Sequence, residues 1–230
     1  TKGKRITIPT KRTAPFNKWS EWPGSKMIQG CALSEDSLIL WFEIPEDVKV
    51  VGSVVGLDIG VHKLISDSNG DHYGREFKIV RNKIRRRKPG SKNRAQSFAE
   101  RENLINRTIN QLPLDHVRVI GVEALHDMKR GKKKGRGKSF RKAIAPWTYR
   151  RVLTMIEHKA QENRVLLVKV DPANTSRTCP NCGAVRKENR RGEKFLCVTC
   201  DHAGDADSIG AQNILARTLV TLGSVESPRL

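Results

Sequence analysis

Four of the five cysteines in this chain stand in two C-x-x-C pairs, and this spacing limits how the surrounding residues can fold. Cys179 and Cys182 form the first pair, and Cys197 and Cys200 form the second, with residues 183–196 between them. The pattern is typical of a four-cysteine zinc ribbon, in which each pair makes one knuckle. Four thiolates would close the coordination shell, so we expect one structural Zn²⁺. Its binding would supply roughly 10–16 kcal/mol to a module too small for a core of its own.

The cysteines also bear on where the chain works. In a secreted protein they would pair as disulfides, whereas in a reducing compartment they would bind metal. The sequence has no secretory signal pattern and no apolar run of membrane-spanning length. We therefore expect a cytoplasmic, nucleoid-associated protein with no membrane partner. The fifth cysteine, Cys31, has no such spacing, and we expect it to be a small buried side chain.

Positive charge is the second strong constraint, since 44 Lys and Arg against 24 Asp and Glu give a net charge of +20. Such a chain repels itself unless a polyanion neutralises it, and nucleic acid is the usual partner. The cations gather in two runs. We expect them to contact phosphates in a salt-dependent way, although a solvated charged face is the alternative. The second run is interleaved with glycines and is predicted to be a mobile loop. The predicted nucleic-acid-binding residues are Arg85, Arg86, Arg87 and Lys88 in the first run, and Lys129, Arg130, Lys132, Lys133, Lys134, Arg136, Lys138, Arg141 and Lys142 in the second.

The remaining pattern predicts a mixed α/β sheet with helices on its faces, because hairpin-like strands are followed by alternating helices and strands. Asn69-Gly70 marks a hairpin turn, and Pro89-Gly90 separates two helical segments. Trp19, Trp22 and Trp41 are expected to form a small core rather than a base-stacking platform. The expected strands are 25–33, 37–44, 51–60, 62–68, 72–77, 117–123 and 165–170, and the expected helices are 79–88, 91–111, 146–163 and 207–219.

Three acidic residues interrupt otherwise apolar elements. Asp58 lies inside the most hydrophobic strand, Glu123 ends another such strand, and Asp207 opens the last helix. A lone buried carboxylate is costly unless a cation or a donor compensates it. If the three converge, their oxygens suit Mg²⁺ or Mn²⁺. Two such ions about 4 Å apart would activate a water and stabilise the leaving oxygen of a phosphodiester.

Each carboxylate taken singly also has a simpler interpretation. Asp58 would hydrogen-bond the turn at Gly60, Glu123 would pair with an arginine, and Asp205 or Asp207 would cap a helix N-terminus. The presence of all three in so basic a chain favours the metal site. The histidines near these positions are interpreted as ordinary neighbours rather than ligands; they are His62, His126 and His202.

Four motifs resemble those of a known family. They are G-L-D-I-G at 56–60, V-I-G-V-E at 119–123, T-S-R-T-C-P-N-C-G at 175–183, and C-V-T-C followed by D-A-D-S-I-G-A-Q-N-I within 197–214. Over about residues 51–219 the chain is similar to the RuvC nuclease and zinc-ribbon half of TnpB proteins and of type V CRISPR effector nucleases. The resemblance implies an RNase H-like fold and RNA-guided, Mg²⁺-dependent cleavage of DNA. It assigns the catalytic carboxylates to Asp58, Glu123 and Asp207.

The resemblance also implies a division of the chain. Residues 1–50 would be a β-rich segment at the end of a β-barrel (wedge) domain. Residues 51–174 would be the first part of the RuvC-like domain, 175–204 the ribbon and 205–230 the C-terminal helix. Because the sequence begins at a threonine and lacks most of the family's N-terminal recognition lobe, we expect it to belong to a longer protein.

Two positions depart from the family pattern. TnpB proteins commonly have arginine and asparagine where this chain has Ala206 and Ile209. Two rival functions therefore stay open. One is a guide-dependent DNA-binding protein that does not cleave, and the other is a zinc-ribbon nucleic-acid-binding protein without an active site.

Overall fold

The structure, a computed structural model, describes residues 11–45, 47–124 and 146–226. The chain divides into two compact units, Thr1–Asp47 and Val48–Leu230. The first unit contains helix α1 (Ala14–Ser20) and two antiparallel strands, β1 (Lys26–Leu33) and β2 (Leu38–Glu43), which confirms the predicted hairpin.

The apolar side chains of this first unit are not gathered into a core. Trp41 is 44% exposed, Trp19 and Trp22 are only half-buried, and none of the unit's described residues is buried. Cys31, expected to be buried, is exposed. Both expectations were wrong because one short helix, whose Phe16 packs on Phe42 of β2, is too small to cover a two-stranded ribbon.

The second unit is built on a five-stranded sheet with the order β5-β4-β3-β6-β7. The pairs β3–β4 and β4–β5 are antiparallel, whereas β3–β6 and β6–β7 are parallel, so the predicted mixed sheet is confirmed. The strand expected at 72–77 stops early, because Gly74 has a φ of 67° and Phe77 already belongs to a helix. The strands are β3 (Ser53–Ile59), β4 (Ile65–Asp67), β5 (His72–Tyr73), β6 (Val117–Glu123) and β7 (Leu166–Val170).

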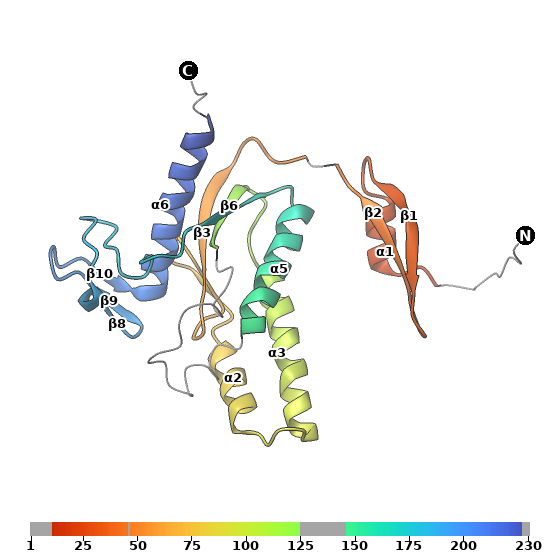
Figure 1. The fold of residues 1–230 in the computed structure, drawn as a ribbon, viewed down its shortest axis with the longest axis horizontal. Helices are drawn as coiled ribbons and strands as arrows, with labels where there is room; N and C mark the ends of the chain where they lie inside the picture. Colours follow the sequence, from red (N-terminus) through yellow and green to blue (C-terminus); the bar gives the residue numbers. More distant parts are fainter. Residues whose placement is uncertain (1–10, 46, 125–145, 227–230) are drawn as a thin grey trace, which may run out of the picture. The chain divides into compact units, whose positions relative to one another are not determined.

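Helices cover both faces of this sheet (Figure 1). On one face lie α2 (Phe77–Arg86), α3 (Lys92–Asn110) and α5 (Pro146–Glu162), which enclose the main hydrophobic core with inward residues of β3 and β6. On the other face lies α6 (Ala206–Glu226), which runs seven residues beyond the predicted end at 219. None of the described helices is long and apolar enough to cross a membrane.

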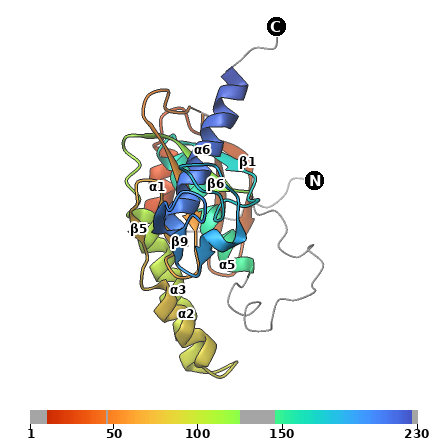
Figure 2. The same ribbon diagram turned by 90° about the vertical axis from the view of Figure 1, so that its left-hand side faces the viewer.

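Helix α6 rests directly on the two central strands because both carry glycine where it passes. Gly56 of β3 and Gly121 of β6 are paired in register. A Cβ atom at Gly56 would stand 2.2 Å from the carbonyl oxygen of Ala211, and one at Gly121 would stand 1.9 Å from Oγ1 of Thr218. Figure 2, viewed from the α6 side, shows this helix crossing in front of the sheet.

The cysteine module is a small antiparallel sheet of order β10-β9-β8. Its strands are β8 (Arg190–Arg191), β9 (Lys194–Leu196) and β10 (Ala203–Asp205), preceded by the short 3-10 helix η1 (Lys187–Asn189). The side chain of Asn189 is fully buried and ties the module together: its amide donates to the carbonyl oxygens of Arg177 and Ala184 and accepts from the N–H of Val198.

Candidate functional sites: a thiolate cluster beside buried carboxylates

The four paired cysteines come together as the sequence predicted. Their sulfur atoms all lie within 4.8 Å of one another. The Sγ atoms of Cys179 and Cys200 are 3.6 Å apart, as are those of Cys182 and Cys197. Tetrahedral Zn²⁺ with Zn–S bonds of about 2.3 Å requires sulfurs about 3.8 Å apart. The cluster therefore fits a tetrahedral metal ion.

Hydrogen bonds from neighbouring N–H groups reach two of these thiols, Cys197 and Cys200. The N–H of Thr199 points to Sγ of Cys197 at 3.4 Å, and the side-chain amide of Asn181 to Sγ of Cys200 at 3.6 Å. Burial alone would raise the pKa of the Cys197 thiol, but the N–H groups of Thr199 and Cys200 outweigh it and lower that pKa to about 6. Because only thiolates bind zinc, this shift favours metal binding near neutral pH.

The carboxylates at Asp58 and Asp207 are brought together by the way β3 runs along α6. Oδ2 of Asp58 lies 3.1 Å from where a Cβ of Gly210 would stand, and Oδ2 of Asp207 lies 3.8 Å from where a Cβ of Gly60 would stand. Glycines in G-L-D-I-G and in D-S-I-G thus leave room for both carboxylates between strand and helix.

Glu123 reaches the same face from the next strand. Its carboxylate accepts a hydrogen bond from the hydroxyl of Thr175. Thr175 is itself fixed to α6, because the amide of Asn213 donates to the carbonyl oxygens of Thr175 and Thr178 at 2.7 and 2.8 Å. The hydroxyl of Tyr149, in α5, donates to the main-chain carbonyl oxygen of Glu123 at 2.7 Å. Thr175 therefore holds the carboxylate of the glutamate, and Tyr149 holds its backbone.

Asp58 and Glu123 are half-buried, and their ionised forms are electrostatically unfavourable there. Burial, followed by repulsion from Glu123 and Asp207, raises the pKa of Asp58 to about 8. Burial also raises the pKa of Glu123, although the Thr175 hydrogen bond and the charges of Arg217 and Arg190 oppose the rise. Carboxylates that repel one another in a buried site are stabilised by a bound cation.

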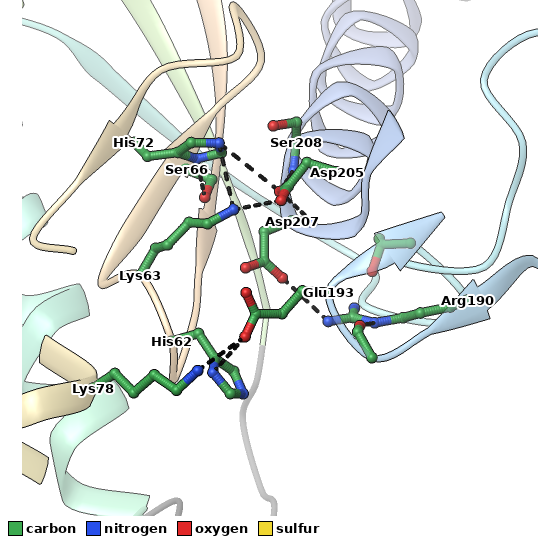
Figure 3. A network of polar contacts seen from close by, with 12 residues as sticks. His62, Lys63, Ser66, His72, Lys78, Arg190, Glu193, Asp205, Asp207 and Ser208 are labelled. Atoms are coloured by element: carbon green, nitrogen blue, oxygen red, sulfur yellow. Dashed lines mark hydrogen bonds and ion pairs between the residues drawn. The ribbon is translucent and has the colours of Figure 1, made fainter. Parts of the chain in front are cut away.

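Asp207 and Asp205 have different surroundings (Figure 3). The Asp207 side chain is 8% exposed and pairs with the guanidinium of Arg190, whose nitrogen lies 3.1 Å from Oδ1. Oδ1 of Asp205 accepts the N–H groups of Asp207 and Ser208 at 3.1 and 3.2 Å. The capping interpretation therefore applies to Asp205, while Asp207 points toward the ribbon.

The three carboxylates stand farther apart than a bound metal would hold them. Among the described residues, the four cysteines are the only group of three or more potential ligands whose atoms lie within 4.8 Å of one another. Asp207 pairs with Arg190 instead, and Glu123 bonds to Thr175.

Sequence reasoning did not assign roles to several residues around the carboxylates. Thr175 and Asn213 lie inside two of the four motifs, so their position was a usable signal. Arg190 and Lys63 had none, because each reaches the site only through tertiary contact. Ile209, where TnpB proteins commonly have asparagine, is 3% exposed and packs in the ribbon's apolar cluster with Cys179, Cys197, Phe195 and Ala206.

The predicted nucleic-acid contacts are only partly described. Arg85, Arg86 and Lys88 lie at the end of α2 and just beyond it, and all three are exposed. Arg87 bonds to the carbonyl oxygen of Asn93 and to Oγ of Ser97, so it also holds the turn between α2 and α3. The second basic run and His126 lie outside the described residues.

The chain is similar to known proteins over part of its length. Residues 149–214 match the family described as Cas12f1-like, TNB domain. The chain is 38% identical over 69 residues to the CRISPR-associated endodeoxyribonuclease Cas12f1 of Sulfoacidibacillus thermotolerans, covering 30% of this chain and 16% of that protein. It is 30% identical over 94 residues to the TnpB-like protein MJ0751 of Methanocaldococcus jannaschii, covering 40% and 33%. It is 45% identical over 51 residues to the putative RNA-guided DNA endonuclease InsQ of Escherichia coli, covering 22% and 13%. The chain thus spans about a third or less of these relatives.

Proposed function

Since this chain belongs to the family of TnpB and type V CRISPR effector proteins, we propose that it is the catalytic part of an RNA-guided DNA endonuclease. In this proposal the mixed sheet is an RNase H-like (RuvC) domain in two parts, 51–174 and 205–230, and the zinc ribbon at 175–204 is inserted between them. Residues 1–50 are the end of a preceding β-rich domain.

The observation that carries the proposal is that Glu123 and Asp207 lie close enough to Asp58, on one face of the sheet, to contribute with burial to raising its pKa to about 8. A fold rarely retains such repulsion without a use for it, and perturbed carboxylates cluster at functional sites. Two of the relatives are named as endonucleases acting on DNA, which favours phosphodiester hydrolysis over other carboxylate chemistry.

Each acidic residue has a defined part in this site. Asp58, Glu123 and Asp207 would hold Mg²⁺ or Mn²⁺, whose oxygen preference their donors match. Two such ions, when bound, would activate a water and stabilise the leaving oxygen of a phosphodiester. The expected products are a 5′-phosphate and a 3′-hydroxyl. Thr175 fixes the orientation of the Glu123 carboxylate through its hydroxyl.

Arg190 is the residue of the ribbon that reaches this site. Its guanidinium donates to Oδ1 of Asp207, and its positive charge partly opposes the rise in the pKa values of Asp58 and Glu123. The fork of the guanidinium has donors to spare beyond one carboxylate, and guanidinium groups match phosphate oxygens well. In this proposal Arg190 orients Asp207 and contacts the phosphate of the strand to be cut.

Nucleic acid is the partner that the charge of +20 requires. The proposed partners are a DNA target and a guide RNA, with sequence choice left to base pairing and backbone contacts made by the basic residues. A cytoplasmic, nucleoid-associated location follows from this proposal.

Cleavage of single-stranded DNA by the full chain in Mg²⁺ tests the function, with co-purified RNA extracted and sequenced. We expect Asp58→Ala and Asp207→Ala each to lower the rate by about 10³-fold or more, as removal of one member of a catalytic unit does. Asp115→Asn, an exposed aspartate between α3 and β6, is the matched control and should cleave normally.

The two rivals give different results in the same assay. Tight, salt-sensitive DNA binding without cleavage would support the binding-only protein. Binding that depends on zinc but never on Mg²⁺ would support a ribbon without an active site. The packing of Ile209 inside the ribbon cluster, rather than against the carboxylates, weakens one argument for the first rival.

A further inference from the structure

We propose that Lys63 is a positioning residue for the carboxylate site, because it binds Asp205 and thereby fixes the first turn of α6, which carries Asp207. The proposal rests on the proposed function, since it concerns how one of the three metal-binding carboxylates is held. It also separates the two aspartates of the D-A-D motif into a structural residue and a ligand.

The contacts of Lys63 run from the antiparallel edge of the sheet to the start of α6 (Figure 3). Its Nζ lies 2.5 Å from Oδ2 of Asp205 and 3.4 Å from Nε2 of His72. Nδ1 of His72 lies 2.8 Å from Oγ of Ser66. An ammonium donating to Nε2 requires the tautomer with its proton on Nδ1, which then donates to Ser66. The lysine is thus held between a strand residue and a helix cap.

Asp205 uses both carboxylate oxygens in this arrangement. Oδ2 binds Lys63, while Oδ1 accepts the N–H groups of Asp207 and Ser208. Because the backbone N–H of Asp207 is one of these donors, any movement of the Asp205 carboxylate is passed directly to Asp207. An aspartate so neutralised and so occupied is a poor ligand for a further cation.

The lysine itself stands on a rigid support. Its side chain is 15% exposed, and the next residue, Leu64, is fully buried in the main core. The N–H of Gly60 donates to the carbonyl oxygen of Leu64, which closes the loop that carries Lys63. The loop therefore places Lys63 at a fixed position relative to the sheet, and Lys63 in turn fixes Asp205 at the start of α6, which lies 142 residues later in the sequence.

Two explanations of the role of Lys63, its positive charge and its positioning of Asp205, predict opposite effects of a Lys63 substitution on metal affinity. Removing a positive charge near a cation site strengthens cation binding by Coulomb's law. Removing a partner that orients a metal ligand weakens it, typically by about 10–100-fold. The sign of the change for Lys63→Met therefore distinguishes the two without any activity measurement.

The experiment is a titration of the full chain with Mn²⁺, in which free ion is counted by its electron paramagnetic resonance signal. We expect Lys63→Met to weaken the Asp207-dependent binding about 10–100-fold and Lys63→Arg to restore most of it. Lys83→Met is the matched control, since its Nζ also lies 2.7 Å from a carboxylate, that of Glu100, but on the exposed α2–α3 hairpin.

A second variant keeps the test decisive should Lys63→Met fail to fold. Asp205→Asn retains an oxygen for the helix N–H groups but loses the ion pair. Positioning and the loss of negative charge both predict weaker Mn²⁺ binding for this variant, so the double variant with Lys63→Met decides: charge alone would return its binding toward that of wild type. The double variant should be no weaker than either single one, because both remove the same interaction. Additive effects, or unchanged or tighter binding in Lys63→Met, would overturn the positioning role. If Asp207→Asn binds Mn²⁺ as tightly as wild type does, the proposed function itself would be overturned instead.

Discussion

The two candidate metal sites are linked through Asp207, which follows Cys200 closely in the chain, yet they are built in opposite ways. In the ribbon the ligands are already gathered, and few other buried side chains accompany them. In the sheet a large apolar core is complete without any ion, and the three carboxylates are held near one another against their repulsion. We therefore expect the ribbon to require its metal for folding, whereas the sheet would fold without metal and, under the proposed function, would require it only for cleavage.

The largest expected effect is the loss of the ribbon when zinc is removed. Chelation, or Cys197→Ser, should unfold residues 175–202, since roughly 10–16 kcal/mol of binding energy is lost. Hydrogen exchange should show rapid exchange there while β3 and β6 stay protected. Cys31→Ser, in an exposed position outside the cluster, should leave the zinc content unchanged. If β3 and β6 lost their protection at the same time, the sheet would also depend on zinc, and the contrast between the two sites would not hold.

The next effect concerns the contact between the sheet and α6. Gly56→Ala would place its methyl group against the backbone of Ala211, and Gly121→Ala would place it against the side chain of Thr218. Overpacking of this kind costs about 1–3 kcal/mol or more. Thr218→Ala should partly rescue Gly121→Ala but not Gly56→Ala, because the clash at Gly121 is with the Thr218 side chain whereas the clash at Gly56 is with backbone atoms. Chemical denaturation of the single and double variants measures each of these costs.

A suitable control lies further along the same helix. Gly223 has no atom within 4 Å of where its Cβ would stand. Gly223→Ala should therefore stabilise the protein, by up to about 1 kcal/mol from helix propensity. Destabilisation there would mean that α6 tolerates no alanine for reasons other than the close approach to the sheet.

A smaller effect of opposite sign is expected at Asp58. Its folded pKa of about 8 lies above the ordinary value of 3.8, so its penalty is absent below about pH 4 and complete above about pH 8. Each pKa unit corresponds to about 1.4 kcal/mol, so in chelator Asp58→Asn should raise the free energy of unfolding at pH 8 by at least about 1 kcal/mol. The gain should shrink toward pH 4.

Mg²⁺ provides the complementary measurement for Asp58. Wild type should gain stability from Mg²⁺ at pH 8, and Asp58→Asn should gain little, because the ion would compensate the charge that the amide lacks. Thermal unfolding at several Mg²⁺ concentrations records both. An Asp58→Asn variant less stable than wild type at every pH would show that the site is not strained.

The smallest effect is expected where the ribbon touches the sheet domain at its surface. Glu193 pairs with Nδ1 of His62 at 2.9 Å and with Nζ of Lys78 at 3.3 Å, and these side chains are well exposed. Glu193→Gln should change the unfolding free energy by only about 0.2–1 kcal/mol, and less at high salt. A larger loss would mean that this contact, rather than the packing of Ile209, attaches the ribbon.

Local sequence patterns predicted most strands and helices of this fold and the cysteine cluster. The residues that they did not predict reach the site through tertiary contacts. The β-branched runs of β3 and β6, the Asn69-Gly70 turn and the paired cysteines each contain their own signal. The pairing of Arg190 with Asp207 and of Lys63 with Asp205 depends on how the ribbon and the hairpin pack. Likewise, the apolar character of Trp41 and Cys31 could not reveal that the one short helix described in their unit leaves both side chains exposed.

The first turns of α6 have a consequence for anyone who exchanges ribbons between relatives of this protein. Ile209 completes the ribbon's apolar cluster, and Asn213 binds the carbonyl oxygens that lead into the first knuckle. A grafted ribbon that ends at residue 204 would lack Ile209 and Asn213, and so would lose part of its apolar cluster and the hydrogen bonds before its first knuckle. The transferable unit therefore ends near residue 214, and it carries Asp207 with it, so an exchange of ribbons is also an exchange of one third of the acidic triad.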